Sequence, residues 1–423
     1  MYIKQVKIQN IRSIESFEMV FEQPAGWHVI IGDNGAGKSS VVRAIALALV
    51  GPKEVLGLRA DWREWLNRNS NEGKIALAIE LSSEDKHSGR QGKLKNEQIP
   101  NILELRRTND LVELGESKDL KPDPFKYNWG KGGGWFSVAY GPFRRFEGGN
   151  PEWSKVFYSQ PKLGAHLSVF GEDVALTEAL DWLVKLNYQV LEQKEEGDII
   201  DDIKKLVNSP SFLPHNAVIE SISSEGVVFK DGYGTTVHVN QMSDGYRSIL
   251  SLTFELIRQL IRIYGANTVF KTIRKGTMVI DLPGVVLIDE VDAHLHPTWQ
   301  TKIGQWFTQY FPNIQFIVTT HSPLICRAAE KGTIWRLAAP NSTVASGLVD
   351  GIPRERLIFG NVLDAYSTEV FGKSVTISTE ANDKRTRLGE LNIKSLLGSL
   401  SKNEEGELME LKKIFPTEKA LEG

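Results

Sequence analysis

The segment that most constrains the fold is GDNGAGKSS, Gly32 to Ser40, which lies between two apolar runs. GWHVIIG (26–32) is typical of a buried strand, and VVRAIALALV (41–50) of a buried helix that ends at Gly51-Pro52. The segment fits G-x-x-x-x-G-K-[ST], and its glycines let successive backbone N–H groups face an anion at a helix start. Because of this context, the segment predicts a phosphate site in an α/β core rather than an ordinary glycine turn that caps a helix.

Each residue of this loop is a candidate nucleotide contact. Lys38 would reach the β and γ phosphates, and the Ser39 hydroxyl would ligate Mg²⁺. The loop alone does not separate ATP from GTP, but the N-K-x-D motif with which GTPases normally read the base is missing from the sequence. The predicted contacts are Gly32, Asp33, Asn34, Gly35, Ala36, Gly37, Lys38, Ser39 and Ser40.

A second constraint is VVLIDEVDAHLHPTW (285–299), in which three carboxylates and two histidines follow an apolar strand. Open parallel sheets bind ligands at the carboxyl ends of their strands, so Asp289 would lie beside the phosphate loop as a second Mg²⁺ partner. Glu290, one residue further, is placed to polarise a water for attack on the γ phosphate. The two acids therefore belong to the same predicted site as the loop.

The other three polar residues of this stretch need a separate interpretation. Asp292, His294 and His296 are of types that suit Zn or Mn, but no Cys-rich or H-E-x-x-H pattern accompanies them. The alternatives are a contact in a catalytic dimer and a structural turn before Pro297.

Two further segments extend the predicted site. QMSDGYRSIL places Ser243 as a helix N-cap and Gly245 in the first turn, where free N–H groups and a hydroxyl make an anion site. The alternative there is a plain capped helix. FIVTTHSP ends a buried strand at His321, and a lone strand-end histidine is more often structural than catalytic. Together with the phosphate loop, both segments favour a functional role.

The remaining patterns outline the organisation of the chain. Alternating or apolar runs predict strands at 1–11, 16–22, 74–82, 284–289, 314–322 and 334–337, and a hairpin over 217–239 that turns at Asp231-Gly232. Helical spacing covers 175–208 and 248–265. The Pro/Gly-rich, aromatic stretch 119–153 predicts loop and short strand rather than helix, and the polar chain from about 341 has a charged, helical end.

Composition excludes several classes of protein. With 423 residues, 41% hydrophobic and 24% charged, the chain is ordinary for one large domain or two, and a net charge of −3 argues against a uniformly basic nucleic-acid binder. The single cysteine, Cys326, has no partner for an intramolecular disulfide, and the N-terminus lacks a signal-peptide pattern. No window reaches about 18 consecutive apolar residues. We therefore expect a cytoplasmic protein with no membrane partner.

The ordered motifs GDNGAGKSS, QMSDGYRSIL, VVLIDEVDAHLHPTW and TTHSP resemble those of the ABC-type ATPases of the RecF, SMC and OLD lineage, over residues 1 to about 340. In that family ATP and Mg²⁺ are sandwiched between two heads. The resemblance makes Gly32–Ser40 the Walker A loop and Asp289 and Glu290 the Walker B acids. It makes Ser243 and Gly245 the signature that contacts the γ phosphate of the opposite head, and His321 the switch histidine.

The same resemblance suggests weaker candidates and shows departures. NIRS near the N-terminus looks like the strand-end arginine these heads use near the nucleotide, which is Arg12 here. DAHLH falls on the D-loop, the segment that crosses the dimer interface. The signature reads MSDGY where transporters have LSGGQ, Gln160 is a poorly anchored Q-loop candidate, and Arg144 and Arg145 are candidate contacts to nucleotide or DNA.

The resemblance implies the following architecture. The fold class is α/β, a P-loop NTPase of the ABC-head type with a mixed or parallel core sheet, an antiparallel β lobe, a helical lobe and no long coiled coil. The head would occupy 1–340, with Walker A and the β lobe in 1–175. The helical lobe, signature, Walker B and switch histidine would fall in 176–340, and a partly helical tail in 341–423.

The closest branch by motif is that of anti-phage defence ATPases, such as the ATPase subunit of Septu-type systems, whose family partner is an HNH nuclease. We therefore expect an ATPase that forms a homodimer or higher oligomer of heads and controls a separate nuclease, HNH-type rather than TOPRIM, with DNA as a further partner. The alternatives are a RecF-like DNA repair ATPase and a scaffold whose bound ATP is largely not hydrolysed. A transporter ATPase is disfavoured by the altered signature.

Overall fold

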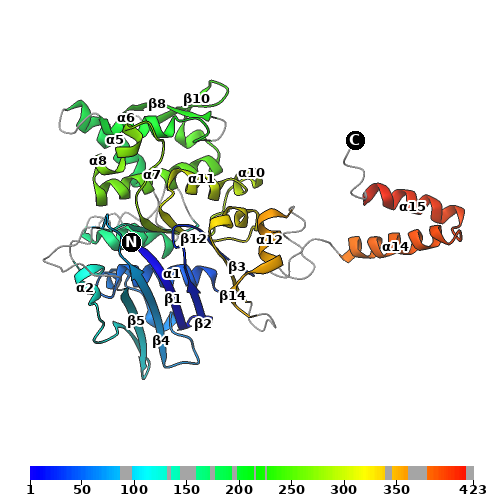
Figure 1. Cartoon of the computed structure of the whole chain (residues 1–423), viewed down its shortest axis with the longest axis horizontal. Coiled ribbons are helices and arrows are strands. Elements are labelled where there is room, and N and C mark those ends of the chain that lie inside the picture. The colour runs from blue at the N-terminus through cyan, green and yellow to red at the C-terminus, as the bar shows by residue number, and fades with distance from the viewer. Residues whose placement is uncertain are drawn as a thin grey trace.

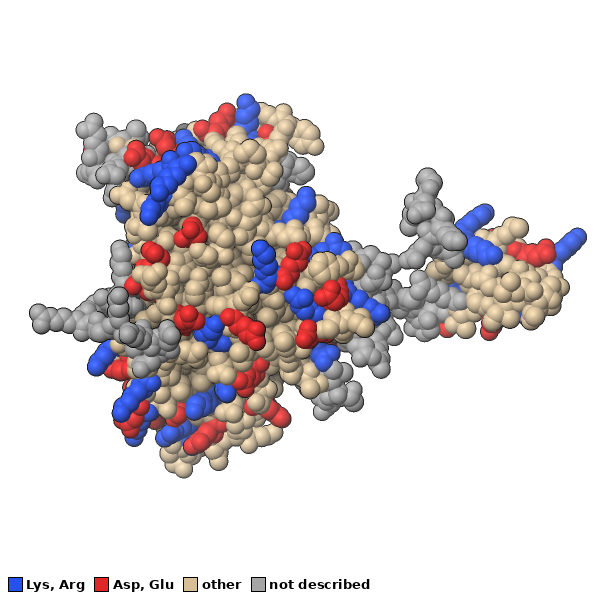
Figure 2. Space-filling model, in the orientation of Figure 1, with Lys and Arg blue, Asp and Glu red and all other residues tan. Residues whose placement is uncertain are grey.

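The computed structural model describes residues 1–85, 98–130, 135–142, 159–171, 177–192, 198–213, 216–223, 226–338, 345–360 and 379–415. Arg144 and Arg145 lie outside these residues. The described part forms two packed lobes and a separate pair of C-terminal helices (Figure 1). On the face shown in Figure 2, basic and acidic side chains are interspersed.

A six-stranded mixed sheet forms the centre of the molecule. Its order is β14-β13-β3-β12-β11-β7, and all neighbours are parallel except β13 and β14. The central strands β3 (Gly26–Gly32), β12 (Ile314–Thr319) and β11 (Gly284–Ile288) are almost wholly buried apolar runs, as expected of parallel strands covered on both faces. Their carboxyl ends meet at one edge. The outer strands are β7 (Ser137–Tyr140), β13 (Ile334–Leu337) and β14 (Gly347–Leu348).

An antiparallel sheet forms the β lobe. Its order is β2-β1-β4-β5-β6, and its strands alternate buried and exposed residues because one face packs on the core and the other meets solvent. Helix α1 (Lys38–Val50) lies between the two sheets and is buried along nearly its whole length. The strands are β1 (Tyr2–Ile11), β2 (Ile14–Val20), β4 (Glu72–Glu80), β5 (Ile99–Thr108) and β6 (Leu111–Glu116).

The helical lobe packs on the other side of the central sheet (Figure 1). Its longest helix, α7 (Asp244–Tyr264), buries an apolar face against α5 (Thr177–Leu191) and β7. Helix α6 (Asp198–Val207), the short α8 (Ala266–Val269) and α9 (Lys271–Arg274) complete the helices on this side. A three-stranded antiparallel sheet, β10-β9-β8, covers them and leads directly into α7. Its strands are β8 (Val218–Ser223), β9 (Gly226–Lys230) and β10 (Thr236–His238).

The chain ends in helices. Helix α12 (Gly351–Phe359) packs on the 3₁₀ segment η6 (Pro323–Lys331). Helices α14 (Thr379–Leu396) and α15 (Lys402–Ile414) pack on each other through a small cluster of Leu391, Leu408 and Leu411, to the right of the rest in Figure 1. None of the helices in the described ranges is long and apolar enough to cross a membrane.

Most predicted elements are confirmed, and the following differences bear on how well the sequence patterns worked. The second strand begins at Ile14 rather than 16, because it pairs with β1 through a tight turn at residues 12–13. The stretch 217–239 is a three-stranded meander rather than one hairpin. Within 119–153 a short helix, α2 (Pro124–Tyr127), is capped by the Asp123 side chain, so the expectation of no helix there was wrong. Strands β5 and β6 were not predicted.

Candidate functional site

The phosphate loop lies at the carboxyl edge of the central sheet, between β3 and α1. Gly35 (φ 78°) and Gly37 (φ 100°) adopt left-handed conformations that other residues rarely take, and Gly37 forms the N-cap position of α1. The loop thus has the turn and the helix start that the sequence predicted. Among its residues Asp33, Asn34 and Gly35 are exposed, Gly32, Gly37 and Ser39 are half-buried, and Ala36, Lys38 and Ser40 are buried.

The Lys38 ammonium is folded back onto the loop. Its Nζ donates to the carbonyl oxygens of Gly32 at 2.7 Å and Asp33 at 3.0 Å. Burial lowers the pKa of Lys38, and the nearby carboxylates of Glu290 and Asp289 oppose that shift. The Lys38 ammonium therefore lies inside the curve of the loop, which is where a phosphate group would bind.

Asp289 joins the second motif to the loop. It follows β11, is 1% exposed, and its N–H donates to the Tyr140 carbonyl at 2.8 Å, which continues the parallel ladder. Its Oδ1 accepts from the Ser39 hydroxyl at 3.1 Å and from the Thr319 hydroxyl at 2.6 Å. A hydroxyl and a carboxylate so close together are the oxygen donors that Mg²⁺ prefers, so these two residues fit that ion.

Thr319 is a site residue that the sequence analysis did not single out. It is fully buried at the end of β12, and its Oγ1 both donates to Asp289 and accepts the Glu290 N–H at 2.7 Å. One hydroxyl therefore orients both acids of the DE pair. The available signal was its place in TTHSP, two residues before His321.

Glu290 and His321 lie at the same edge of the sheet. Glu290 is half-buried and has a left-handed backbone (φ 48°), which turns the chain away from the strand direction directly after Asp289. His321 is exposed, and its Nδ1 lies 3.5 Å from Lys38 Nζ. The structure thus brings together Lys38, Ser39, Asp289, Glu290 and His321, as predicted from motifs far apart in sequence.

The residues after Glu290 form a turn held by side-chain hydrogen bonds. Asp292 Oδ1 accepts from the Thr320 hydroxyl at 2.5 Å, and the His296 ring accepts the Thr298 N–H at 3.3 Å at the start of α10 (Pro297–Gln300). His294 is exposed with φ 65°. Nowhere in the described ranges do three His, Cys, Asp or Glu side chains form a group able to hold a metal. The turn interpretation is thus supported for Asp292 and His296, and the dimer contact stays a prediction.

The signature segment begins α7 as predicted. Ser243 occupies the N-cap position with an extended backbone and is exposed, but its hydroxyl makes no capping hydrogen bond. Gly245 lies against the D-loop, where a Cβ would come within 3.1 Å of the His294 carbonyl oxygen. Within the described residues no hydrogen bond joins this segment to the phosphate loop of its own chain.

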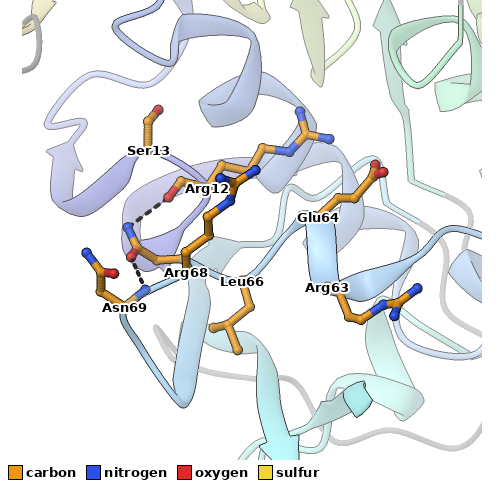
Figure 3. Close-up of a pocket in the computed structure, with 8 residues that line it drawn as sticks. Arg12, Ser13, Arg63, Glu64, Leu66, Arg68 and Asn69 are labelled. Atoms are coloured by element: carbon orange, nitrogen blue, oxygen red, sulfur yellow. Dashed lines mark hydrogen bonds between the residues drawn. The ribbon is translucent and has the colours of Figure 1, made fainter. Parts of the chain in front are cut away.

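Arg12 lines a pocket of about 770 Å³ between the β1–β2 turn and residues 63–69 (Figure 3). Its guanidinium lies 4.4 Å from the Trp65 ring centroid, and burial together with Arg43 lowers the pKa of Arg12. The adjacent Ser13 hydroxyl lies 3.0 Å from where a Cβ on Gly37 would stand, so the pocket borders the phosphate loop.

Within the described residues, no hydrogen bond links Gln160 to the phosphate loop. It precedes α4 (Pro161–His166), and its Oε1 is buried against Gly57 without a hydrogen-bond partner among them. Its assignment as the Q-loop glutamine stays a prediction.

Comparison with known proteins places the chain in a family. Residues 28–327, which include every motif described above except Arg12, match the family model "AAA domain, putative AbiEii toxin, Type IV TA system". The chain belongs to this AAA family. The predicted resemblance to ABC-type ATPases of the RecF and SMC lineage, and the predicted fold class, are confirmed.

Relatives of this family member include a Septu protein and a retron ATPase. The chain is 24% identical to the Septu protein PtuA of Bacillus mycoides (strain KBAB4) over 344 residues, which are 79% of this chain and 40% of that protein. It is 37% identical to the retron Ec83 probable ATPase of Escherichia coli over 127 residues, 30% of this chain and 22% of that protein. The chain therefore aligns with two fifths or less of the length of either relative.

A solved structure with a similar arrangement is the SMC head domain from Thermotoga maritima. It superposes with a TM-score of 0.44 at 16% identity, and the match covers 83% of this chain and 99% of that one.

Proposed function

We propose that the chain is a Mg²⁺-dependent ATPase whose heads dimerise around ATP and control a separate nuclease. The observation that carries the ATPase part is the 3.1 Å hydrogen bond from Ser39 to Asp289, because it joins the phosphate loop to the acidic strand end within one site. The head is assigned to residues 1–340 and the tail to 341–423.

Each residue of the site has a defined role in this proposal. Ser39 and Asp289 would hold Mg²⁺, which when bound offsets the charge of the β and γ phosphates. Lys38 would exchange its two loop carbonyls for phosphate oxygens, and Glu290 would take the proton of the water that attacks the γ phosphorus as ADP leaves. His321, 3.5 Å from the lysine, is placed to contact the same phosphate. Arg12 would contact the rest of the nucleotide.

The second half of the site is assigned to a second copy. Ser243 and Gly245 make no hydrogen bond to their own phosphate loop among the described residues, so in this proposal they meet the γ phosphate bound by the opposite head. ATP binding then closes the dimer, and hydrolysis releases it. This arrangement makes the oligomeric state depend on the nucleotide.

The test is Glu290→Gln in the full chain. We expect phosphate release to fall by at least ~100-fold, because removing a catalytic base costs about that much, while ATP binding persists and the dimer accumulates with ATP. Glu113→Gln, an exposed strand residue in the β lobe, is the matched control and should hydrolyse ATP normally. Unchanged phosphate release in Glu290→Gln would overturn the assignment of the base.

The nuclease partner is proposed from similarity to the Septu protein PtuA, which the chain matches over 79% of its own length. The partner class is an HNH-type nuclease encoded beside this chain. Co-purification of that neighbour with the tagged chain, and its absence when the loop variant Lys38→Ala is used, would support control by the ATP site. A chain that purifies without any nuclease but binds DNA only with ATP would favour the RecF-like alternative.

A further inference from the structure

Tyr233 has the most exposed aromatic side chain among the described residues, at 92%. It stands at the tip of the β9–β10 turn, and the turn that carries it is well ordered by hydrogen bonds. The Asp231 carboxylate accepts hydrogen bonds from the N–H groups of Tyr233 at 2.9 Å and Thr235 at 2.8 Å. The Asp231 N–H in turn donates to the Thr235 carbonyl oxygen at 2.9 Å. The backbone that carries the exposed ring is therefore ordered by these hydrogen bonds.

This tip lies beside the signature segment. β10 ends at His238, five residues before Ser243, and the 3₁₀ segment η5 (Val239–Gln241) that joins them packs on β9, the other strand of this turn. Burial raises the pKa of Tyr246, in the first turn of α7, to about 12, and Asp231 and Tyr233 add to that shift. Asp244, with a 68% exposed side chain, is paired with Arg247 on the same surface. The signature surface around Tyr233 is thus aromatic, and the Asp244 carboxylate on it already has a partner.

The pocket beside the phosphate loop is rich in arginine. Arg12, Arg63 and Arg68 line it with one carboxylate, Glu64. Arg63 is already paired with Asp61 at 2.6 Å, whereas exposed Arg68 has no ion pair among the described residues. In Figure 3 the side chains of Arg12 and Arg68 extend toward the same side of the pocket, and Arg63 points away from them. Arg68 therefore offers a guanidinium at the rim.

We propose that Tyr233 of one copy packs on the Arg68 guanidinium of a second copy when the heads close. The inference rests on the proposed head-to-head dimer, in which a signature segment meets the phosphate loop of the other head. Because Tyr233 borders the former and the arginine pocket borders the latter, closure brings an exposed ring toward an unpaired guanidinium. A cation–π contact of this kind is a common anchor at protein interfaces.

The first experiment measures the dissociation constant of the ATP-bound dimer of the full chain carrying Glu290→Gln. We expect Tyr233→Ala and Arg68→Ala each to raise the dissociation constant of the dimer by about 3- to 30-fold. The double variant should have a dissociation constant no higher than that of the more impaired single variant, because both substitutions remove the same contact. Tyr188→Ala, a half-exposed tyrosine on α5, and Arg63→Ala are the matched controls and should change nothing.

The second experiment tests the geometry directly by cross-linking. Cys326 is the only cysteine and is buried, so a Tyr233→Cys chain mixed with an Arg68→Cys chain carries only the introduced exposed thiols. We expect an ATP-dependent cross-link between the two chains, and none between Tyr188→Cys and Arg68→Cys chains.

The outcomes separate this inference from the proposed function. If the parent chain dimerises with ATP but the two substitutions have no effect or act additively, and no cross-link forms, the contact is overturned while the dimer stands. If the parent does not dimerise, both fail. If Arg68→Ala abolishes polynucleotide binding and leaves the dimer unchanged, the pocket serves nucleic acid instead.

Discussion

Replacing Thr319 with Val tests whether one hydroxyl aligns the two Walker B acids. Valine has nearly the same shape, so the fully buried site keeps its packing, but Asp289 Oδ1 loses its 2.6 Å donor and the Glu290 N–H loses its 2.7 Å acceptor. The substitution therefore changes hydrogen bonding at the site and little else.

The size of the effect follows from those two contacts. Leaving a buried hydrogen-bonding group unsatisfied costs about 1–3 kcal/mol, so the free energy of unfolding should fall by about that amount. Groups that orient a metal ligand typically contribute 10- to 100-fold to metal affinity or activity, which is ~1.4–2.7 kcal/mol. We expect phosphate release to fall by about that factor and to need a higher Mg²⁺ concentration.

The assay compares three chains: the parent, Thr319→Val and Thr319→Ser. Phosphate release is measured across a Mg²⁺ titration, nucleotide binding separately, and unfolding in urea. The serine variant retains the hydroxyl and loses only the methyl group, so it should recover most of the activity. The reasoning is refuted if Thr319→Val keeps the parent Mg²⁺ dependence, or if the serine variant is equally impaired, because the methyl group would then matter instead.

Three further predictions test other parts of the structure. Trp65→Ala removes the ring beneath Arg12 and should weaken ATP binding several-fold in a filter or fluorescence assay, while Trp62→Ala on the same segment should not. Burial lowers the pKa of His28 and of His166 to about 4, below the unfolded value, so below about pH 6.5 the unfolded chain takes up protons that the folded chain does not. Each therefore destabilises the fold by about 1.4 kcal/mol per pH unit as pH falls from about 6.5 toward 4, which urea midpoints at pH 7 and pH 5 would reveal; an unchanged midpoint would contradict it. Gly245→Ala should push the His294 carbonyl by a few tenths of an ångström and lower turnover without loss of ATP binding; equal turnover would show that the D-loop accommodates the methyl group.

The local motifs were readable because each depends on residue type and near neighbours. Glycines 35 and 37 adopt the left-handed backbone that the loop requires, and the apolar run before Asp289 is a buried parallel strand. Such features follow from backbone sterics and hydrophobic periodicity within about ten residues. The central sheet, α1 and α7 were predicted for the same reason.

Short and polar elements were harder to predict. The meander over 218–238 is built of strands only 6, 5 and 3 residues long, and the polar character of β5 and β6 gave only a weak alternation. The α2 helix is four residues long and depends on one Asp123 cap in a stretch otherwise rich in turn residues. Short elements carry too little periodicity to outweigh their composition.

The sequence by itself determined the phosphate loop, the DE pair, the histidine that ends the β12 segment and the family to which they belong, because each is a contiguous chemical pattern. Only the tertiary structure decided that the Thr319 hydroxyl serves both acids, that Asp292 and His296 stabilise a turn, and that Arg12 shares a pocket with Arg68. Apart from the His296 cap, these contacts join residues of strand ends and loops that are 28 or more positions apart. Their geometry arises when parallel strands bring their carboxyl ends to one edge of a sheet, which no local pattern specifies.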